Sequence, residues 1–325
     1  MRILSMDGGG YLGLATAAFI EETERHFDSM CHERFDMFCG TSTGAIIALA
    51  LASGMSGKEI ASLYQDFGGK VFNNPFPGSR LLRTARGIVV ARYSNKALRK
   101  ALTDAFGDMT LGDLRAKNKS VLVAAFCVTT GKPRVFKTNH SSDLTRDDGY
   151  LVRDIALASA AAPVYLPVVK LQSPTTKCEE WYCDGGVFAN HPALLGYAEA
   201  VSHLEVDPRE IYVLSLSTPR ADLAERASTR NIVQQFLLSR GLISWGTKLA
   251  GVMIASTSMI AHETLRRILA WQPEAGARYV RIELQKPSGV DMDIATPKAT
   301  ETLRQIGFDQ AFRTEVRNRL NIFFN

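Results

Sequence analysis

The chain has 325 residues and a formal net charge of +5, and 46% of its residues are hydrophobic and 22% charged. These shares match ordinary globular proteins and supply enough apolar surface to offset the entropy of ordering, which excludes a disordered, collagen-like or low-complexity chain. The first residues, Met-Arg-Ile-Leu-Ser, are too short an apolar run for a signal peptide, and no window of about 18 uncharged apolar residues occurs. We therefore expect a cytoplasmic protein without a transmembrane helix.

Short apolar runs alternate along the chain with stretches of helical periodicity. Strands are expected at residues 2–6, 35–39, 120–128, 134–138, 211–216 and 278–284. Helices are expected at residues 12–27, 43–52, 58–71, 192–204, 226–271 and 299–320. Strands that alternate with helices are typical of an α/β fold with a largely parallel sheet. Because no repeat or linker divides the chain, we expect one domain over residues 1–325, with the catalytic motifs within 1–200 and a helical, basic part over about 219–325.

A G-x-S-x-G motif, Gly40-Thr41-Ser42-Thr43-Gly44, lies between an apolar strand and a helix of small residues. A nucleophile elbow requires this strand-turn-helix context, because the turn holds the serine at the head of the helix. The flanking Gly40 and Gly44 let neighbouring backbone approach closely, and the helix N-terminus favours developing negative charge. The simpler interpretation is a tight turn in which Ser42 caps the helix.

Three consecutive glycines, Gly8, Gly9 and Gly10, follow Asp7 at the end of the first strand. Their N–H groups are unobstructed, which suits the binding of an oxyanion or a phosphate. The spacing of Gly8, Gly10 and Gly13 also matches a dinucleotide-binding fingerprint. That fingerprint needs an acidic residue at the end of the second strand, where this chain runs directly into the serine turn, so an oxyanion loop is favoured.

Asp184 precedes two further glycines after a strand-like run, so its carboxylate is expected at the mouth of an open turn. A serine hydrolase commonly uses a histidine as its base. Three histidines follow Asp184 in the chain, His191, His203 and His262. None of them stands in a motif of its own. A Ser–Asp dyad needs no histidine, because the carboxylate itself accepts the serine proton.

Taken together, these motifs resemble the patatin-like phospholipase family over residues 2 to about 199. Residues 7–13 resemble the family's glycine-rich oxyanion loop, residues 40–44 its nucleophile elbow and residues 184–186 its catalytic D-G-G. The segment Ser-Ala-Ala-Ala-Pro-Val-Tyr-Leu-Pro over residues 159–167 resembles a further family motif, with one alanine more. Leu12 is a departure, because family members usually carry arginine there.

The resemblance implies a three-layer α/β/α fold and a lipid acyl hydrolase without metal or cofactor. Ser42 would attack an acyl ester and Asp184 would act as the base, while the N–H groups of Gly8, Gly9 and Gly10 stabilise the oxyanion. Two alternatives remain open from the residues. One is a nucleotide-binding sensor with vestigial hydrolase motifs, and the other is a Ser-His-Asp esterase of soluble esters.

A bacterial branch of this family is activated by cyclic oligonucleotides and degrades membrane phospholipid in anti-phage defence. Residues 219–286 hold ten basic and five acidic side chains, which accounts for the whole net charge. We expect this window to bind an anionic effector such as a cyclic oligonucleotide, or to form a homo-oligomer interface, and we expect no DNA or RNA polymer as a partner. Residues 72–93 mix apolar residues with arginines. We expect them to form a mobile lid or a surface that meets the inner face of the membrane, which the active protein joins peripherally. These arginines are Arg80, Arg83, Arg86 and Arg92.

Overall fold

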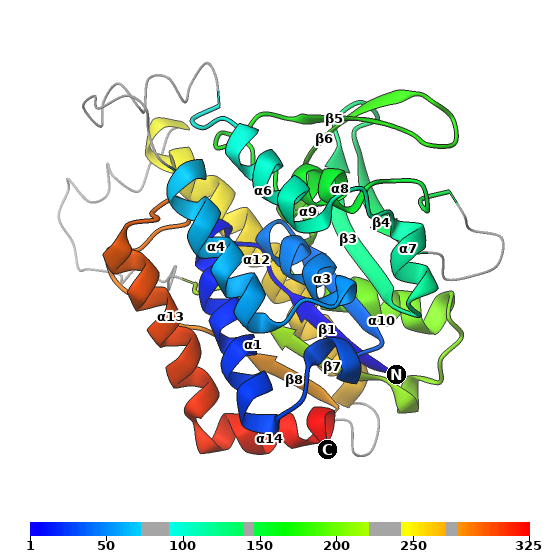
Figure 1. The fold of residues 1–325 in the computed structure, drawn as a ribbon, viewed down its shortest axis with the longest axis vertical. Coiled ribbons are helices and arrows are strands. Elements are labelled where there is room, and N and C mark those ends of the chain that lie inside the picture. The colour runs from blue at the N-terminus through cyan, green and yellow to red at the C-terminus, as the bar shows by residue number, and fades with distance from the viewer. Residues whose placement is uncertain (73–90, 139–145, 221–241, 271–277) are drawn as a thin grey trace.

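The computed structural model describes residues 1–72, 91–138, 146–220, 242–270 and 278–325. Its centre is one sheet with the strand order β5-β6-β3-β2-β1-β7-β8, and β4 pairs with β3 (Figure 1). The strands are β1 (Arg2–Met6), β2 (Met37–Thr41), β3 (Ser120–Cys127), β4 (Lys132–Lys137), β5 (Val169–Gln172), β6 (Glu179–Asp184), β7 (Tyr212–Leu216) and β8 (Tyr279–Ile282). β3, β2, β1, β7 and β8 run parallel, whereas β4 and β6 run antiparallel to β3. The predicted α/β fold with a largely parallel sheet is confirmed.

Both faces of the parallel sheet are covered by helices, so the predicted three layers are present. Successive side chains of a strand point to opposite faces. On β1, Ile3 belongs to a core shared with α10 (Ala193–Ser202) and α12 (Leu242–Ala270). The next residue, Leu4, belongs to the opposite core, which α1 (Gly13–Phe27), α3 (Thr43–Ser53) and α4 (Gly57–Val71) line. Strands that are buried on both faces have nearly continuous apolar sequences, as β1 and β7 do.

β3 changes partner part-way along its length, and this change shapes the site. Its first half pairs with β2, up to the register Thr41–Ala124. β2 ends there because the chain turns into α3. The next register position on β3, Ala125, pairs with Asp184, the last residue of β6. β6 therefore continues the line of β2 from the opposite direction.

The remaining helices include five that the sequence patterns did not predict, α2, α6, α7, α8 and α9. These helices are α2 (Cys31–Arg34), α6 (Lys96–Phe106), α7 (Leu111–Ala116), α8 (Val152–Ser159), α9 (Gly186–Ala189), α13 (Pro297–Phe312) and α14 (Thr314–Phe324). A single closing helix over residues 299–320 was wrong, because Arg313 has extended backbone (φ −62°, ψ 125°) and separates α13 from α14. The turn lets α14 bury Phe323 and Phe324 against Phe35.

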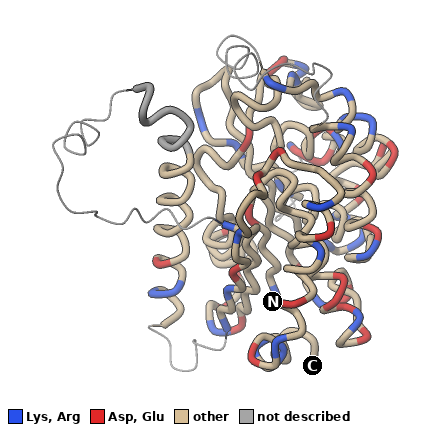
Figure 2. Tube along the Cα trace, turned by 90° about the vertical axis from the view of Figure 1, so that its left-hand side faces the viewer, with Lys and Arg blue, Asp and Glu red and all other residues tan. Residues whose placement is uncertain are grey.

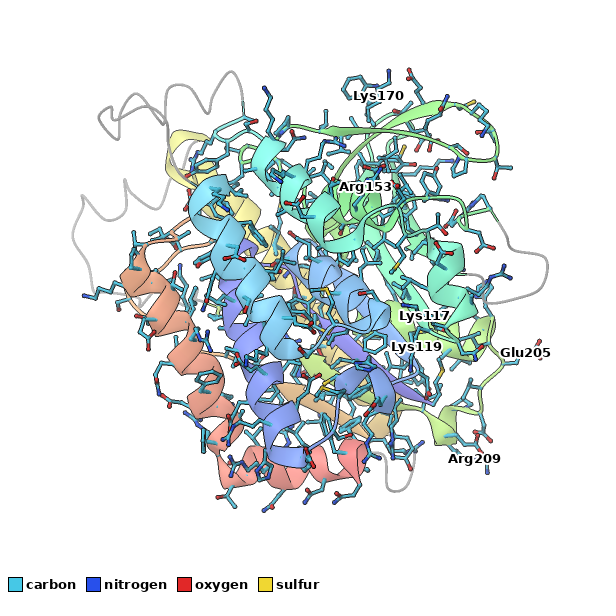
Figure 3. All side chains as sticks on the ribbon, in the orientation of Figure 1. Lys117, Lys119, Arg153, Lys170, Glu205 and Arg209 are labelled. Carbon is cyan, nitrogen blue, oxygen red and sulfur yellow. The ribbon has the colours of Figure 1, made fainter. Side chains whose placement is uncertain are left out.

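The surface is polar and mixed in charge. In Figure 2, lysine and arginine are interspersed with aspartate and glutamate around the body. Figure 3 shows labelled charged side chains such as Lys170, Glu205 and Arg209 at the periphery. Among the helices of the described ranges, none is long and apolar enough to cross a membrane.

α13 packs closely on α1 at Gly307. A Cβ atom at this position would lie 2.3 Å from the carbonyl oxygen of Ala15 and 2.7 Å from the backbone nitrogen of Phe19. The contact atoms are backbone, so they cannot rotate away. The backbones of α13 and α1 are therefore in close contact at Gly307.

Gly307→Ala should lower the free energy of unfolding by about 1–3 kcal/mol, because overpacking separates the two helices. Gly69→Ala on α4 is the matched control, since a Cβ there meets nothing within 4 Å. The control should be neutral or stabilising by up to about 1 kcal/mol through its helix propensity. Urea unfolding of the three proteins measures both effects, and equal midpoints for the two variants would contradict the close packing.

Candidate active site

Ser42 lies in the turn between β2 and α3, in a strained backbone conformation. Its φ is 56° and its ψ is −125°, which is a rare region for a residue with a side chain. The turn is so tight that a Cβ at Gly40 would lie 2.3 Å from the carbonyl oxygen of Gly44, and one at Gly44 would lie 2.2 Å from that of Met6. Both glycines are therefore required by close approach. The arrangement is that of a nucleophile elbow.

Asp184 is brought to Ser42 by the end of β6. The Ser42 side chain lies close enough to its carboxylate to lower the pKa of Asp184, and the N–H of Gly186 donates to Asp184 Oδ1 at 2.7 Å. Burial raises the pKa of Asp184 to about 6, while the hydrogen bonds from Ser42 and Gly186 act in the opposite direction. A carboxylate with this pKa can accept a proton near neutral pH. The structure thus brings together the serine and the aspartate that the motifs singled out.

The glycine loop passes beside Ser42. A Cβ at Gly8 would lie 3.0 Å from the Cβ of Ser42. The N–H of Gly8 donates to the carbonyl of Asn190 at 3.3 Å, so this donor is already engaged, which differs from its expected role. No residue within the described part of the chain accepts a hydrogen bond from the N–H of Gly9 or Gly10. Gly10 lines the same pocket as Ser42, and its backbone has φ +59°.

An apolar pocket opens at Ser42 and Gly10 and runs between α3, α4, α6 and the segment after α8. Most of its wall is hydrocarbon or aromatic. These wall residues include Ile46, Tyr64, Phe67, Val71, Leu98 and Leu166. A concave site with an apolar wall and a few polar groups at one end suits a ligand with an apolar tail and one reacting polar group.

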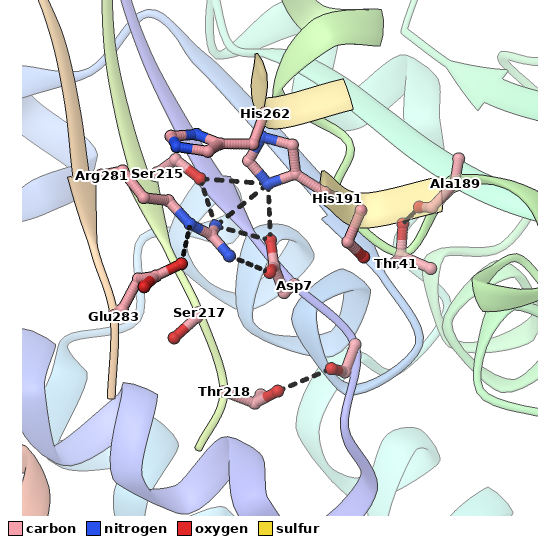
Figure 4. A network of polar contacts seen from close by, with 12 residues as sticks. Asp7, Thr41, Ala189, His191, Ser215, Ser217, Thr218, His262, Arg281 and Glu283 are labelled. Atoms are coloured by element: carbon pink, nitrogen blue, oxygen red, sulfur yellow. Dashed lines mark hydrogen bonds and ion pairs between the residues drawn. The ribbon is translucent and has the colours of Figure 1, made fainter. Parts of the chain in front are cut away.

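Asp7, which begins the glycine loop, lies in a buried polar network on the other side of the sheet (Figure 4). Arg281 of β8 donates to both of its carboxylate oxygens, at 3.0 and 2.5 Å. Arg220 bonds to Oδ2, and His191 Nδ1 lies 3.1 Å from Oδ1. Burial would raise the pKa of Asp7, but Arg281 and Arg220, with His191, outweigh it and hold this pKa well below its usual range. Asp7 is therefore ionised at neutral pH.

The family model of patatin-like phospholipases matches residues 4–197, which is more than half of the chain. The chain belongs to the patatin-like phospholipase family. The match contains the glycine loop, the serine turn and the D-G-G sequence. The predicted family and the prediction of a lipid acyl hydrolase are confirmed.

Several patatin-like relatives align along nearly the whole chain. The cGAMP-activated phospholipase of Pseudomonas aeruginosa is 30% identical over 320 residues, which cover 96% of this chain and 88% of the relative. The cGAMP-activated phospholipase of Vibrio cholerae is 28% identical, with 98% of this chain and 92% of the relative covered. Patatin-like protein 2 of Arabidopsis thaliana is 27% identical, with 94% and 82% covered. Among solved structures, VipD from Legionella pneumophila aligns with 98% of this chain and 66% of its own at 16% identity, with a TM-score of 0.49.

The histidines of this patatin-like chain are engaged away from Ser42. His191 is buried and contacts Asp7, Ser215 and Arg281 through Nδ1, and the Tyr279 hydroxyl lies 3.3 Å from its Nε2. His262 Nδ1 lies 2.7 Å from the same hydroxyl, and His203 is at the surface beside Ser202. His140 falls outside the described residues. Of the histidines that the structure describes, none is hydrogen-bonded to Ser42 or Asp184, so a Ser-His-Asp triad is not supported.

The basic window over residues 219–286 is in part internal, so some of its positive charge does not lie at the surface. Arg281 and Arg220 bind Asp7, and Arg278 is buried and donates to the carbonyl of Pro208 at 2.9 Å. Arg266 and Arg267 are exposed and pair with Glu263. Residues 221–241 and 271–277 of the window, and 73–90 of the expected membrane-facing segment, lie outside the described residues.

Ser159 is a residue that the motif analysis did not single out, although it begins the quoted Ser-Ala-Ala-Ala-Pro segment. Its Oγ accepts a hydrogen bond from the N–H of Ser42 at 2.9 Å and donates to the carbonyl of Ala124 at 2.6 Å. It therefore links the strained elbow to β3, at the register where β2 ends. The signal that could have identified it is its place as the first residue of the Ser-Ala-Ala-Ala-Pro segment.

Ser159→Ala should lower the free energy of unfolding by about 1–3 kcal/mol, because the buried N–H of Ser42 loses its acceptor. It should also slow the labelling of Ser42 by a fluorophosphonate probe. Ser5→Ala is the matched control, because Ser5 is equally buried and its Oγ has no hydrogen-bond partner in the structure as described. Chemical unfolding and timed labelling of both variants measure the difference, and similar losses for both would refute the role of Ser159.

Proposed function

We propose that the chain hydrolyses fatty-acyl esters of membrane phospholipids, with Ser42 as nucleophile and Asp184 as general base. The observation that carries this proposal is the placement of Asp184, at the end of β6, beside the strained elbow of Ser42 at an apolar pocket. The apolar lining of the pocket favours a substrate with an acyl chain over a small polar ester, because contact between apolar groups is favourable in water. The polar end of the substrate would stay at the mouth.

In the first half of the reaction, Ser42 Oγ attacks the ester carbonyl while its proton passes to the Asp184 carboxylate. The carbonyl oxygen becomes the oxyanion, and we propose the N–H groups of Gly9 and Gly10 as its donors, because they are not engaged elsewhere in the described structure. Gly8 would serve by its small size, which allows the loop to approach Ser42. Collapse of the intermediate breaks the bond to the lysolipid oxygen, which takes the proton from Asp184.

In the second half, water attacks the acyl-enzyme and gives its proton to Asp184. The fatty acid leaves, and Ser42 recovers its proton from the aspartate. The position of Ser42 at the N-terminus of α3 adds a favourable helix dipole for the developing charge. None of these steps requires a metal ion, and the described side chains include no cluster of His, Cys, Asp and Glu that could hold one.

Ser42→Ala and Asp184→Asn should each lower phospholipid hydrolysis by several orders of magnitude with unchanged folding, and the double variant should be little worse than either, because the two residues act as a unit. In the wild type, kcat/KM should fall as the pH drops through about 6, because the protonated Asp184 cannot accept the serine proton. Fatty-acid release from vesicles and a pH profile measure both effects. An Asp184→Asn enzyme that keeps more than about a tenth of the activity would rule out the dyad.

We further propose that a cyclic oligonucleotide activates the enzyme in anti-phage defence. Support comes from the relatives, since the Pseudomonas aeruginosa and Vibrio cholerae proteins are named cGAMP-activated phospholipases and an Escherichia coli relative is named a cUMP-AMP-activated phospholipase. The activated form would join the inner face of the membrane peripherally, as a homo-oligomer. The whole chain would act as one catalytic domain, because β7 and β8 complete the sheet that holds the site.

A panel of cyclic di- and trinucleotides should contain at least one compound that raises fatty-acid release from phospholipid vesicles by tenfold or more. The effect should depend on protein concentration if activation involves assembly, because a ligand shifts an equilibrium through its differential affinity for the two states. Ser42→Ala with the same compounds is the control for contaminating lipase. Full activity in dilute protein without any of these compounds would overturn activation, while leaving the hydrolase function intact.

A further inference from the structure

The glycine loop is held by segments that lie far away in the chain. The N–H of Asp7 donates to Leu216 at 3.0 Å, and the Thr218 hydroxyl donates to the carbonyl of Gly8 at 2.7 Å. At the other end of the loop, the N–H of Tyr11 donates to the carbonyl of Met292 at 2.8 Å. These bonds fix the backbone at the two ends of the loop, and they leave the N–H groups of Gly9 and Gly10 between them.

One side chain of the loop is charged, and it is completely buried. Asp7 is 0% exposed, and its carboxylate is the centre of the network in Figure 4. The two terminal nitrogens of Arg281 each donate to one carboxylate oxygen of Asp7, in a forked arrangement. Nη1 of Arg281 also donates to Ser215 Oγ at 2.6 Å. A bidentate arginine–carboxylate pair fixes orientation as well as charge. A buried charge that loses its partner is strongly unfavourable. The position of the Asp7 carboxylate therefore depends on the position of the Arg281 guanidinium.

No arginine is present within the loop of this chain. Leu12, two residues after the last of the three glycines, is buried in the apolar core. The cations that adjoin the loop come instead from β8 and from the turn after β7. Arg281 lies 274 residues after Asp7, and Arg220 lies 213 residues after it.

We propose that Arg281 is a positioning residue for the oxyanion loop. Its fork holds the Asp7 carboxylate, and through the adjoining backbone it sets the distance of the Gly9 and Gly10 N–H groups from Ser42. The margin is narrow, because a Cβ at Gly8 would already touch Ser42. A displacement of about 1 Å in a catalytic group can lower a rate by about 100-fold. This inference rests on the proposed hydrolase function and deepens it.

Arg278 provides a matched control. It is as buried as Arg281 (6% against 8% exposed) and directly precedes the first residue of β8. Its guanidinium donates to the carbonyl of Pro208. Removal of either arginine takes a buried guanidinium from the same edge of the fold. A general loss of stability should therefore affect both variants, whereas a displaced oxyanion loop should affect Arg281 variants alone.

The test compares Arg281→Gln, Arg281→Lys and Arg278→Gln with the wild type on a soluble short-chain ester. We expect kcat to fall about 100-fold in Arg281→Gln with KM within about twofold, because the acyl pocket is untouched. Arg281→Lys keeps the charge but cannot form the fork, so its kcat should fall about tenfold. Arg278→Gln should stay within about threefold of the wild-type kcat. Equal kcat losses for the two glutamine variants, or a loss that appears in KM, would overturn the proposal.

A second measurement does not depend on activity. Hydrogen exchange of the peptide over residues 7–13 should become faster in Arg281→Lys than in the wild type, and it should not change in Arg278→Gln. An unchanged exchange rate in Arg281→Lys would also overturn the proposal. This outcome is decisive even if Arg281→Gln does not fold. A wild type that hydrolyses neither this ester nor phospholipid vesicles, with the panel of cyclic nucleotides present, would instead refute the proposed function, and the exchange rates would still report on the loop.

Discussion

The end of β2 at Thr41 is the constraint on which the site depends. Because the chain turns into α3 at this point, the edge of β3 beyond Ala124 is left without its parallel neighbour. β6 occupies that edge from the opposite direction and stops at Asp184, directly past the serine turn. Backbone hydrogen bonds of two strands thus set the distance between the two side chains. Ser159 then connects the elbow to the same point of β3.

The elbow stores strain that the surrounding packing has to balance. Ser42 has a positive φ, and the turn is closed by backbone contacts at Gly40 and Gly44 that leave no space for a side chain. Such conformations persist where the rest of the fold over-determines them. Here α3 is buried along almost its whole length between the sheet and α4. A rigid scaffold therefore carries the strained residue, which suits a site that must hold its geometry.

The C-terminal part of the chain supports the loop that faces Ser42. β7 pairs with β1, and β8 pairs with β7. This pairing brings the Arg281 side chain within hydrogen-bonding distance of Asp7. Two of the arginines that make this region basic, Arg220 and Arg281, form ion pairs with the one buried carboxylate of Asp7. The neutral state of His191 fits this arrangement, because burial lowers the pKa of His191 even though Asp7 acts to raise it. The family model ends at residue 197, yet the loop at residue 8 depends on residues beyond it.

The α/β class, the elements around the motifs and the proximity of Ser42 to Asp184 could all be predicted from the sequence. Those features depend on local patterns, because apolar runs, helices of small residues and glycine turns can each be recognised from neighbouring residues. The helices over residues 96–106, 111–116 and 152–159 were missed, because their short amphipathic stretches are stabilised by packing rather than by a distinct local signal. The hydrogen bond from the N–H of Gly8 to Asn190 and the ion pair of Asp7 with Arg281 could not be predicted, because each joins segments far apart in the chain. Whether an arginine lies at the surface or on a buried carboxylate depends on which strands pair, and pairing joins residues more than 200 positions apart.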